Sequence, residues 1–180
     1  GNTDNEYTQK FGKQQGKYYV PQRAAAGLDP WATPQAYDNA KDFFDTGITW
    51  SNSLNVAQML DKSSYSISLG NTHQDGIISS TGMDRYNVKV SADTKLTNNW
   101  SSGFTANYIT TSIDKAVTSG NGLLRTVYAA PPSYDLAGIP SHVDGNPYTQ
   151  NSFRGSFDNA YWAMENNKFT EDTNRFFGNV

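Results

Sequence analysis

The chain of 180 residues contains no cysteine, which excludes disulfide bridges and thiolate metal sites but does not indicate a compartment. It has no run of lysine or arginine and a formal net charge of −3, so it lacks the basic surface that neutralises nucleic-acid phosphates. No apolar stretch approaches the roughly 18 to 20 residues of a membrane-spanning helix, and no secretion signal is recognisable at the start. We expect no nucleic-acid partner, no membrane helix, and a natural protein that begins upstream of Gly1.

The sequence motifs of common enzymes are also missing. There is no Gly-x-Ser-x-Gly, no His-Glu-x-x-His and no phosphate-binding loop. His73 and His142 are far apart in the sequence, and neither has a nearby set of further metal ligands. The chain is therefore predicted not to be an enzyme, with no catalytic residue, metal or cofactor, and both histidines are interpreted as solvated loop residues.

The amino-acid composition is poor in apolar residues but rich in aromatic ones. Hydrophobic residues make up 36% of the chain and aromatic residues 13%, and the polar excess is mostly Asn, Ser, Thr, Gln and Gly rather than charge. Soluble domains usually approach half apolar residues. A transmembrane β-barrel needs apolar side chains only on the lipid-facing side of each strand, so this balance favours a barrel.

Alternation of apolar and polar residues predicts four consecutive strands, at 47–56, 63–70, 84–94 and 100–110. Residues 174–180 alternate again and are predicted to begin a fifth strand that is cut off. Residues 1–46 and 111–173 show no sustained period and are predicted to be extracellular loops. Within the second loop, residues 122–130 and 158–166 are expected to form short helices.

Two features of this pattern favour a membrane barrel. The predicted connections are alternately short and long, at 57–62, 71–82, 95–99 and 111–173, as in barrels with short periplasmic turns and long outer loops. Aromatic residues stand near the ends of the apolar faces, where Trp and Tyr prefer membrane interfaces. The predicted interface residues are Trp50, Tyr65, Tyr86, Trp100 and Tyr108.

The predicted fold class is therefore all-β, an antiparallel up-and-down meander that forms part of a large transmembrane β-barrel. Trp100 and Tyr108 are eight residues apart in the sequence, which corresponds to about 20 Å of height on a tilted strand and is close to the roughly 25 Å apolar band of such barrels. A soluble antiparallel sheet with one wet face shows the same alternation and remains an alternative.

Several short motifs resemble the SusC/RagA family of TonB-linked outer-membrane proteins. They are Asp42-Phe43-Phe44-Asp45-Thr46-Gly47, Asp61-Lys62-Ser63-Ser64-Tyr65, Ser68-Leu69-Gly70-Asn71, Gln74-Asp75-Gly76-Ile77, Thr81-Gly82-Met83-Asp84-Arg85-Tyr86-Asn87, Ala92-Asp93-Thr94-Lys95-Leu96, Ala130-Pro131-Pro132-Ser133-Tyr134 and Tyr161-Trp162-Ala163. Their order and spacing fit the family from about Tyr37 onward. One departure, Ala57-Gln58-Met59-Leu60 in place of a Ser-Gly-Gly-type turn, leaves the tightness of the first hairpin open.

The resemblance implies a barrel of about 22 strands around an N-terminal plug. It implies a location in the outer membrane of a Gram-negative bacterium, in contact with membrane lipid, and import of an oligosaccharide or peptide substrate. It also implies two partners, namely a SusD-like surface lipoprotein and TonB, which would be contacted through an N-terminal part that the sequence lacks. On this reading the chain supplies early barrel strands and loops, lacks the plug, and belongs to a larger assembly.

Four aromatic residues of the long loop are candidates for binding substrate or partner: Tyr134, Tyr148, Tyr161 and Trp162. They could instead pack the interior of the loop, because an ordered loop of this length needs internal packing. Two other functions remain open. One is a soluble β-sandwich that binds carbohydrate, and the other is a passive porin-like channel.

Overall fold

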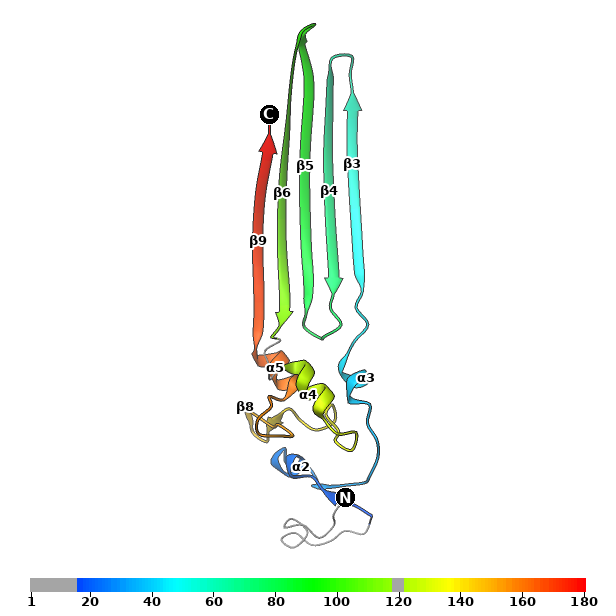
Figure 1. Cartoon of the computed structure of the whole chain (residues 1–180), viewed down its shortest axis with the longest axis vertical. Helices are drawn as coiled ribbons and strands as arrows, with labels where there is room; N and C mark the ends of the chain where they lie inside the picture. The colour runs from blue at the N-terminus through cyan, green and yellow to red at the C-terminus, as the bar shows by residue number, and fades with distance from the viewer. Residues whose placement is uncertain (1–15, 118–121) are drawn as a thin grey trace. The chain divides into compact units, whose positions relative to one another are not determined.

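The computed structural model describes residues 16–117 and 122–180, which form two compact units. The first, here called the sheet unit, comprises Thr46–Lys115 and Phe169–Val180. The second, the loop unit, comprises the described residues of Gly1–Asp45 and Ala116–Lys168. Figure 1 traces both units.

The sheet unit is one layer of five strands. They are β3 (Thr49–Met59), β4 (Ser63–Asp75), β5 (Gly82–Thr97), β6 (Trp100–Ala116) and β9 (Lys168–Asn179), and their spatial order is β3-β4-β5-β6-β9. The first three pairings are antiparallel, and β6 and β9 run in opposite directions in Figure 1. The predicted all-β antiparallel meander is therefore confirmed. The sheet is open, with β3 and β9 at its edges.

The strands are longer than the alternation of side chains predicted. The strand predicted at 63–70 continues to Asp75, the strand predicted at 100–110 continues to Ala116, and the last strand begins at Lys168 rather than at residue 174. The added residues are mostly polar, so they keep the backbone pairing without continuing an apolar face. The predicted long connection at 71–82 is wrong, because only residues 76–81 lie outside the strands. The connections between β3 and β6 are therefore all short and do not alternate between short and long.

The turns are short and locally encoded. Leu60 N–H donates to Ser63 O over 2.7 Å, which leaves Asp61 and Lys62 as a two-residue turn and makes the first hairpin tight. Between β5 and β6 the turn is Asn98-Asn99, where the backbone N–H of Asn99 donates to Thr97 Oγ1 over 3.3 Å. These turns hold the register of the strands that they join.

The loop unit contains only short elements: β1 (Tyr18–Tyr19), α2 (Pro21–Ala25), β2 (Trp31–Ala32), α3 (Asn39–Phe43), α4 (Leu123–Ala129), β7 (His142–Val143), β8 (Asn146–Gln150) and α5 (Ala160–Asn166). β1 pairs with β2, and β7 pairs with β8. The two helices predicted at 122–130 and 158–166 are confirmed as α4 and α5. The segments predicted to be loops are thus mostly irregular but carry several short elements.

The buried hydrophobic side chains of the described residues all lie in the loop unit. They are Val20, Ala26, Phe43, Leu123, Val127, Tyr134, Leu136, Ile139, Phe157, Ala160 and Ala163. Backbone hydrogen bonds join segments far apart in the sequence, such as Asp144 N–H to Ala25 O at 2.9 Å and Tyr37 N–H to Pro132 O at 2.8 Å. The two predicted loops therefore fold together around one core.

Candidate functional site

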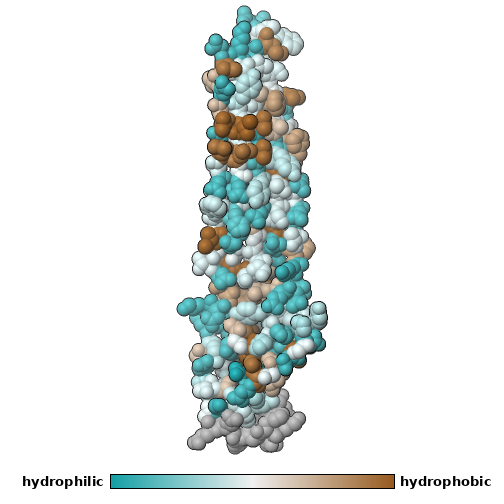
Figure 2. Space-filling model, turned by 180° about the vertical axis from the view of Figure 1, so that it is seen from behind, coloured by the Kyte–Doolittle hydropathy of each residue, from teal (hydrophilic) through white to brown (hydrophobic). Residues whose placement is uncertain are grey.

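The sheet presents two chemically different faces because side chains alternate along each strand. Cross-strand register aligns the apolar side chains of β3, β4, β5 and β6 into rows. One row is Leu54, Leu69, Val88 and Tyr108, the next is Val56, Ile67, Val90 and Ala106, and a third contains Tyr65, Ala92 and Phe104. Figure 2 shows hydrophobic residues gathered in rows across the strands. We call this surface the apolar face.

Most side chains of the apolar face are exposed although they are large and hydrophobic. Nothing among the described residues covers Leu54, Val56, Ile67 or Leu69, each of which is at least 43% exposed. Monomeric soluble proteins rarely leave a contiguous apolar surface of this kind uncovered. An uncovered apolar surface of this kind is typical of a face that contacts lipid or another apolar surface.

All five predicted interface aromatics lie on the apolar face, by their places in the alternation and register. Trp50 is 64% exposed and Trp100 is 72% exposed, and Tyr65, Tyr86 and Tyr108 are also exposed. Tyr108 donates its hydroxyl to Asn174 Oδ1 of β9 over 2.9 Å, which places Asn174 on the same face. Tyr65 and Trp100 lie toward the short turns, and Trp50 and Tyr86 lie toward the opposite ends of the strands. Tyr108 stands at the middle of β6, because this strand continues beyond the predicted end at residue 110 to Ala116.

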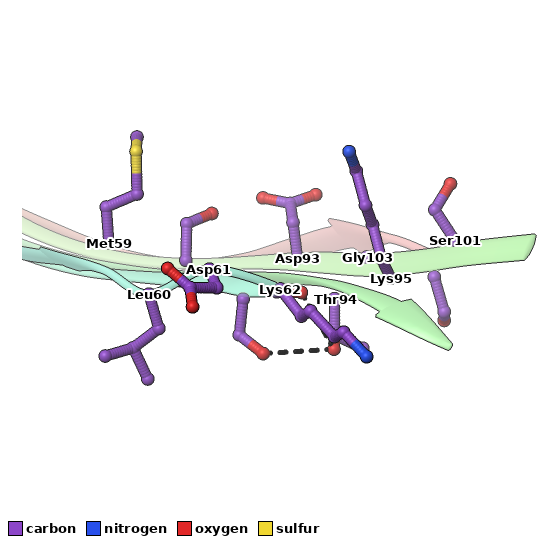
Figure 3. A pocket seen from close by; sticks show the side chains of 12 residues that line it. Met59, Leu60, Asp61, Lys62, Asp93, Thr94, Lys95, Ser101 and Gly103 are labelled. Carbon is purple, nitrogen blue, oxygen red and sulfur yellow. Dashed lines mark hydrogen bonds between the residues drawn. The ribbon is translucent and has the colours of Figure 1, made fainter. Parts of the chain in front are cut away.

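The opposite surface, here called the polar face, is rich in hydroxyl groups that bond across the strands. Ser66 Oγ and Ser91 Oγ are 2.6 Å apart, and Ser51 Oγ and Thr72 Oγ1 are 3.1 Å apart. Figure 3 shows the division of faces beside a shallow pocket at the short-turn end, where Met59, Asp93, Lys95 and Ser101 point to one side and Leu60 and Thr94 to the other. The polar face suits contact with water or a polar ligand.

Two glycines of the polar face make room for polar neighbours. A Cβ at Gly70 would lie 2.3 Å from Asn87 Oδ1, and a Cβ at Gly103 would lie 2.2 Å from Asp93 Oδ1. The side chains of Asn87 and Asp93 therefore lie directly over these glycines. The amide and the carboxylate are held close to the sheet.

His73 is not the isolated loop residue that the sequence predicted. It belongs to β4, where its Nδ1 lies 2.7 Å from Asp84 Oδ1 and its Nε2 lies 3.3 Å from Asp75 Oδ1. The cross-strand pair of His73 and Asp84 could not be foreseen while residues 71–82 were predicted to be a connection. Since the two carboxylates lie at different ring nitrogens, the three side chains do not converge on one point.

The first candidate binding residue, Tyr134, is part of the core of the loop unit. It is 8% exposed, its ring centroid lies 5.7 Å from that of Phe153, and its hydroxyl has no hydrogen-bond partner among the described residues. Burial raises the pKa of this phenol far above its usual value, and the nearby Asp135 adds to the shift. Tyr134 therefore packs the loop interior, and its ring is not offered to a ligand.

The other three candidates are more accessible. Tyr148, in β8, is 84% exposed. Tyr161 and Trp162 are partly buried in α5: the Tyr161 ring packs edge-on against Phe43, and Trp162 Nε1–H donates to Pro147 O over 2.9 Å. Burial, followed by the charge of Asp42, raises the pKa of Tyr161. Tyr148 is the freest aromatic ring of the four.

Buried amides that no sequence pattern indicated organise the loop unit. Asn159 accepts from the backbone N–H of Tyr161 and Trp162, which caps α5, and its Nδ2 donates to Asn151 O over 2.8 Å. Asn151 Nδ2 in turn donates to Gln22 O and Pro140 O. Asparagines in polar loops ordinarily indicate solvated turns, so only the tertiary contacts reveal these as interior groups.

A further aromatic group, missed in the sequence, lies along α4 and α3. Tyr128 is 70% exposed, and its ring centroid lies 6.2 Å from that of Phe44, which stacks edge-on with Phe43. The spacing of Leu124 and Tyr128 along α4 was the available signal, because residues four apart share one helix face. Together these rings form a partly exposed aromatic surface on the loop unit.

Searches for other kinds of site and for relatives found no match. Within the described residues no cluster of His, Asp and Glu could hold a metal ion. No described helix is long and apolar enough to cross a membrane. No model of a known protein family matches the chain, and no curated protein matches it.

Proposed function

We propose that this chain forms part of the wall of an outer-membrane β-barrel. The observation that carries the proposal is the apolar face, whose aligned rows are uncovered while the opposite face is hydroxyl-rich. In a membrane barrel, lipid covers one face of the sheet and the lumen bounds the other. A soluble sheet would instead require a second layer over these rows.

The positions of the aromatic residues support the same proposal. Trp and Tyr concentrate at the two interfaces of a bilayer, and here they stand on both sides of the Val56, Ile67 and Val90 row. The strands have 11 to 17 residues, which exceeds the roughly 9 to 11 that a tilted strand needs to cross the hydrocarbon core. On this proposal, the extra length projects beyond the membrane.

The open sheet requires further strands. β3 and β9 each leave one side unpaired within the described residues, and lipid does not tolerate unpaired backbone groups. Bacterial barrels made from one chain contain an even number of antiparallel strands. Since five strands are present, an odd number of others would complete the wall.

We further propose that the complete barrel is a TonB-dependent transporter of the SusC/RagA type. The support is the set of short motifs from Asp42 to Ala163 and their order, together with the wall proposed above. Such a transporter would import glycans or peptides, cooperate with a SusD-like lipoprotein, and draw energy from TonB through a plug outside this chain. The loop unit would then face the cell exterior, with Tyr148 as the first residue to test for contact with substrate or partner.

The test is to follow Trp fluorescence of the 180-residue chain in lipid vesicles that contain brominated lipids. Trp50 and Trp100 should be quenched most by bromines near the headgroups, with little quenching of Trp31 and Trp162 in the loop unit; phenylalanine variants of each tryptophan assign the signals. A monomeric chain with a cooperative β-sheet melt in buffer without detergent would contradict the wall proposal and favour the carbohydrate-binding sandwich. A passive porin-like channel would be favoured if a full-length protein conducted solutes without energy coupling.

A further inference from the structure

Positive charge is concentrated on the polar face. Alternation and register place five cations there: Arg85, Lys89 and Lys95 on β5, Lys115 on β6 and Arg175 on β9. Two carboxylates accompany them, Asp93 and Glu171, and Glu171 forms an ion pair with Lys115. The excess of cations is notable because the whole chain has a net charge of −3.

Four of these cations have no ionic partner within residues 16–117 and 122–180. No carboxylate of that part of the chain lies within ion-pair distance of Arg85, Lys89, Lys95 or Arg175. The three on β5 and Arg175 are also exposed, so their charges face the space beside the sheet. A surface with an excess of one charge sign attracts counter-ions and raises their local concentration.

The apolar face has the opposite charge pattern. Beyond its rows, toward the ends of β4, β5, β6 and β9, stand four carboxylates, Asp75, Asp84, Asp114 and Asp172, and one cation, Lys168. Thr170 Oγ1 donates to Asp114 Oδ1 over 2.6 Å, which confirms that β9 continues the same alternation. The two faces therefore carry an excess of opposite charge, positive on the polar face and negative on the apolar face.

The cations of β5 are spread along the strand. Arg85 and Lys89 are four residues apart and Lys89 and Lys95 six, which corresponds to about 13 Å and about 20 Å. One small anion cannot contact all three cations at once. An extended anion can bind several of them, and a small anion that moves along the strand can bind them one after another. Rings of Arg and Lys are known to select anions in pores, where several weak sites allow passage.

We propose that the polar face lines a path that favours anionic solutes, namely saccharides bearing carboxylate or sulfate groups. The inference rests on the proposed barrel wall, because only there is the polar face turned toward a lumen. Ser51, Ser53, Ser66, Ser68 and Ser91 add hydroxyl groups that can bond the neutral parts of such a solute. Lys89, opposite Ser68, is central to the series.

The absence of cysteine allows a direct test with thiol reagents of opposite charge. Ser68→Cys places one thiol on the polar face next to Lys89, and Leu69→Cys places one on the apolar face in the neighbouring position. In non-ionic detergent, the Ser68→Cys thiol should react faster with an anionic methanethiosulfonate than with a cationic one. The ratio of the two rates should be on the order of tenfold after each rate is divided by the rate of the same reagent with a free thiol in solution. The preference should fade in 1 M salt, where the Debye length is about 3 Å.

The controls separate this inference from the wall proposal. Adding Lys89→Gln should remove most of the preference at position 68, while Lys41→Gln, which makes the same charge change in the loop unit, should leave it unchanged. The Leu69→Cys thiol should be protected from both reagents by detergent. If it reacts as fast as the Ser68→Cys thiol, the wall proposal fails; if it is protected but position 68 shows no anionic preference, only the path proposal fails.

A saccharide probe tests the class of solute. Dextran sulfate should slow modification of the Ser68→Cys thiol, and neutral dextran of the same length should not. Equal protection by both polymers, or protection by neither, would overturn the assignment to anionic saccharides.

Discussion

For a single residue of the sheet, its place in the alternation along the strand determines whether its side chain lies on the apolar face or on the polar face. Asn55 and Val56 are neighbours on the edge strand β3, both exposed, and they point to opposite faces. In the loop unit, alternation is absent and position in the sequence does not indicate the environment. Tyr134 is buried although it lies in a long predicted loop.

The first prediction concerns Val56→Arg and its matched control, Asn55→Arg. In vesicles, arginine at the centre of the lipid-facing surface should lower the free energy of unfolding by about 2 to 4 kcal/mol, while the control changes it little. Urea titration of the chain in lipid vesicles measures both. Equal effects of the two substitutions would argue against a lipid-facing Val56.

The second prediction concerns Tyr134→Phe. The buried hydroxyl lacks a partner among the described residues, so its removal should leave the stability of the loop unit unchanged or raise it by up to about 1 to 3 kcal/mol. A loss of stability would mean that the hydroxyl bonds through an ordered water. Thermal unfolding followed by near-UV circular dichroism distinguishes the two.

The same residue gives the loop unit a dependence on alkaline pH. The pKa of Tyr134 is raised in the folded chain by burial, so the unfolded chain loses this proton first. Stability is then fully present below the ordinary pKa of about 10 and falls as the pH rises above it. Tyr134→Phe should remove part of this decline, and an unchanged decline would assign it to other phenols such as Tyr161.

At the scale of elements, short helices depend on caps and on buried partners more than on their own propensity. α5 has seven residues, too few for independent stability. Asn159 caps it and links it to Asn151. This one residue therefore connects a helix to the segment that precedes it.

We predict that Asn159→Ala destabilises the loop unit by about 2 to 3 kcal/mol, because it removes a cap and leaves Asn151 O without its donor. Asn159→Asp keeps the cap and loses only the donor, so its effect should be smaller. Asn166→Ala, at an exposed position of the same helix, is the control. Denaturant unfolding of the three variants checks the order, and a control as damaging as Asn159→Ala would refute the role given to the network.

At the scale of the whole molecule, the two units differ in what stabilises them. The loop unit has an interior that includes Val127 and Leu136, whereas the sheet unit is one layer without a covered core. A single layer buries too little apolar surface to be stable in water without lipid, a second layer or further strands. We therefore expect the surroundings to affect the units differently.

Hydrogen exchange followed by mass spectrometry tests this expectation. Amides of α4 and α5 should be protected equally with and without detergent, and amides of β3 to β6 should gain protection only when detergent or lipid is present. Strong protection of the strands in plain buffer would indicate that another protein layer covers the apolar face.

The sequence alone determined the elements whose signals are local. The alternation predicted β3 to β6 and the face to which Trp50, Tyr65, Tyr86, Trp100 and Tyr108 belong, because a period of two needs no knowledge of the partner strand. The apolar group of α4 located that helix, and a second short helix was expected at 158–166, where α5 lies. Strand ends were underestimated because polar side chains continue backbone pairing without a hydrophobic signal, as at His73.

Which residues of the loops are interior depends on long-range packing. Segments before residue 46 and after residue 116 fold around one core, and this buries Tyr134, Asn151 and Asn159 among contacts made by residues more than a hundred positions apart. Such contacts depend on where the backbone returns in space, which no local pattern encodes. Likewise, the cations of β5, β6 and β9 became one charged surface only when the strand order placed them on a common face.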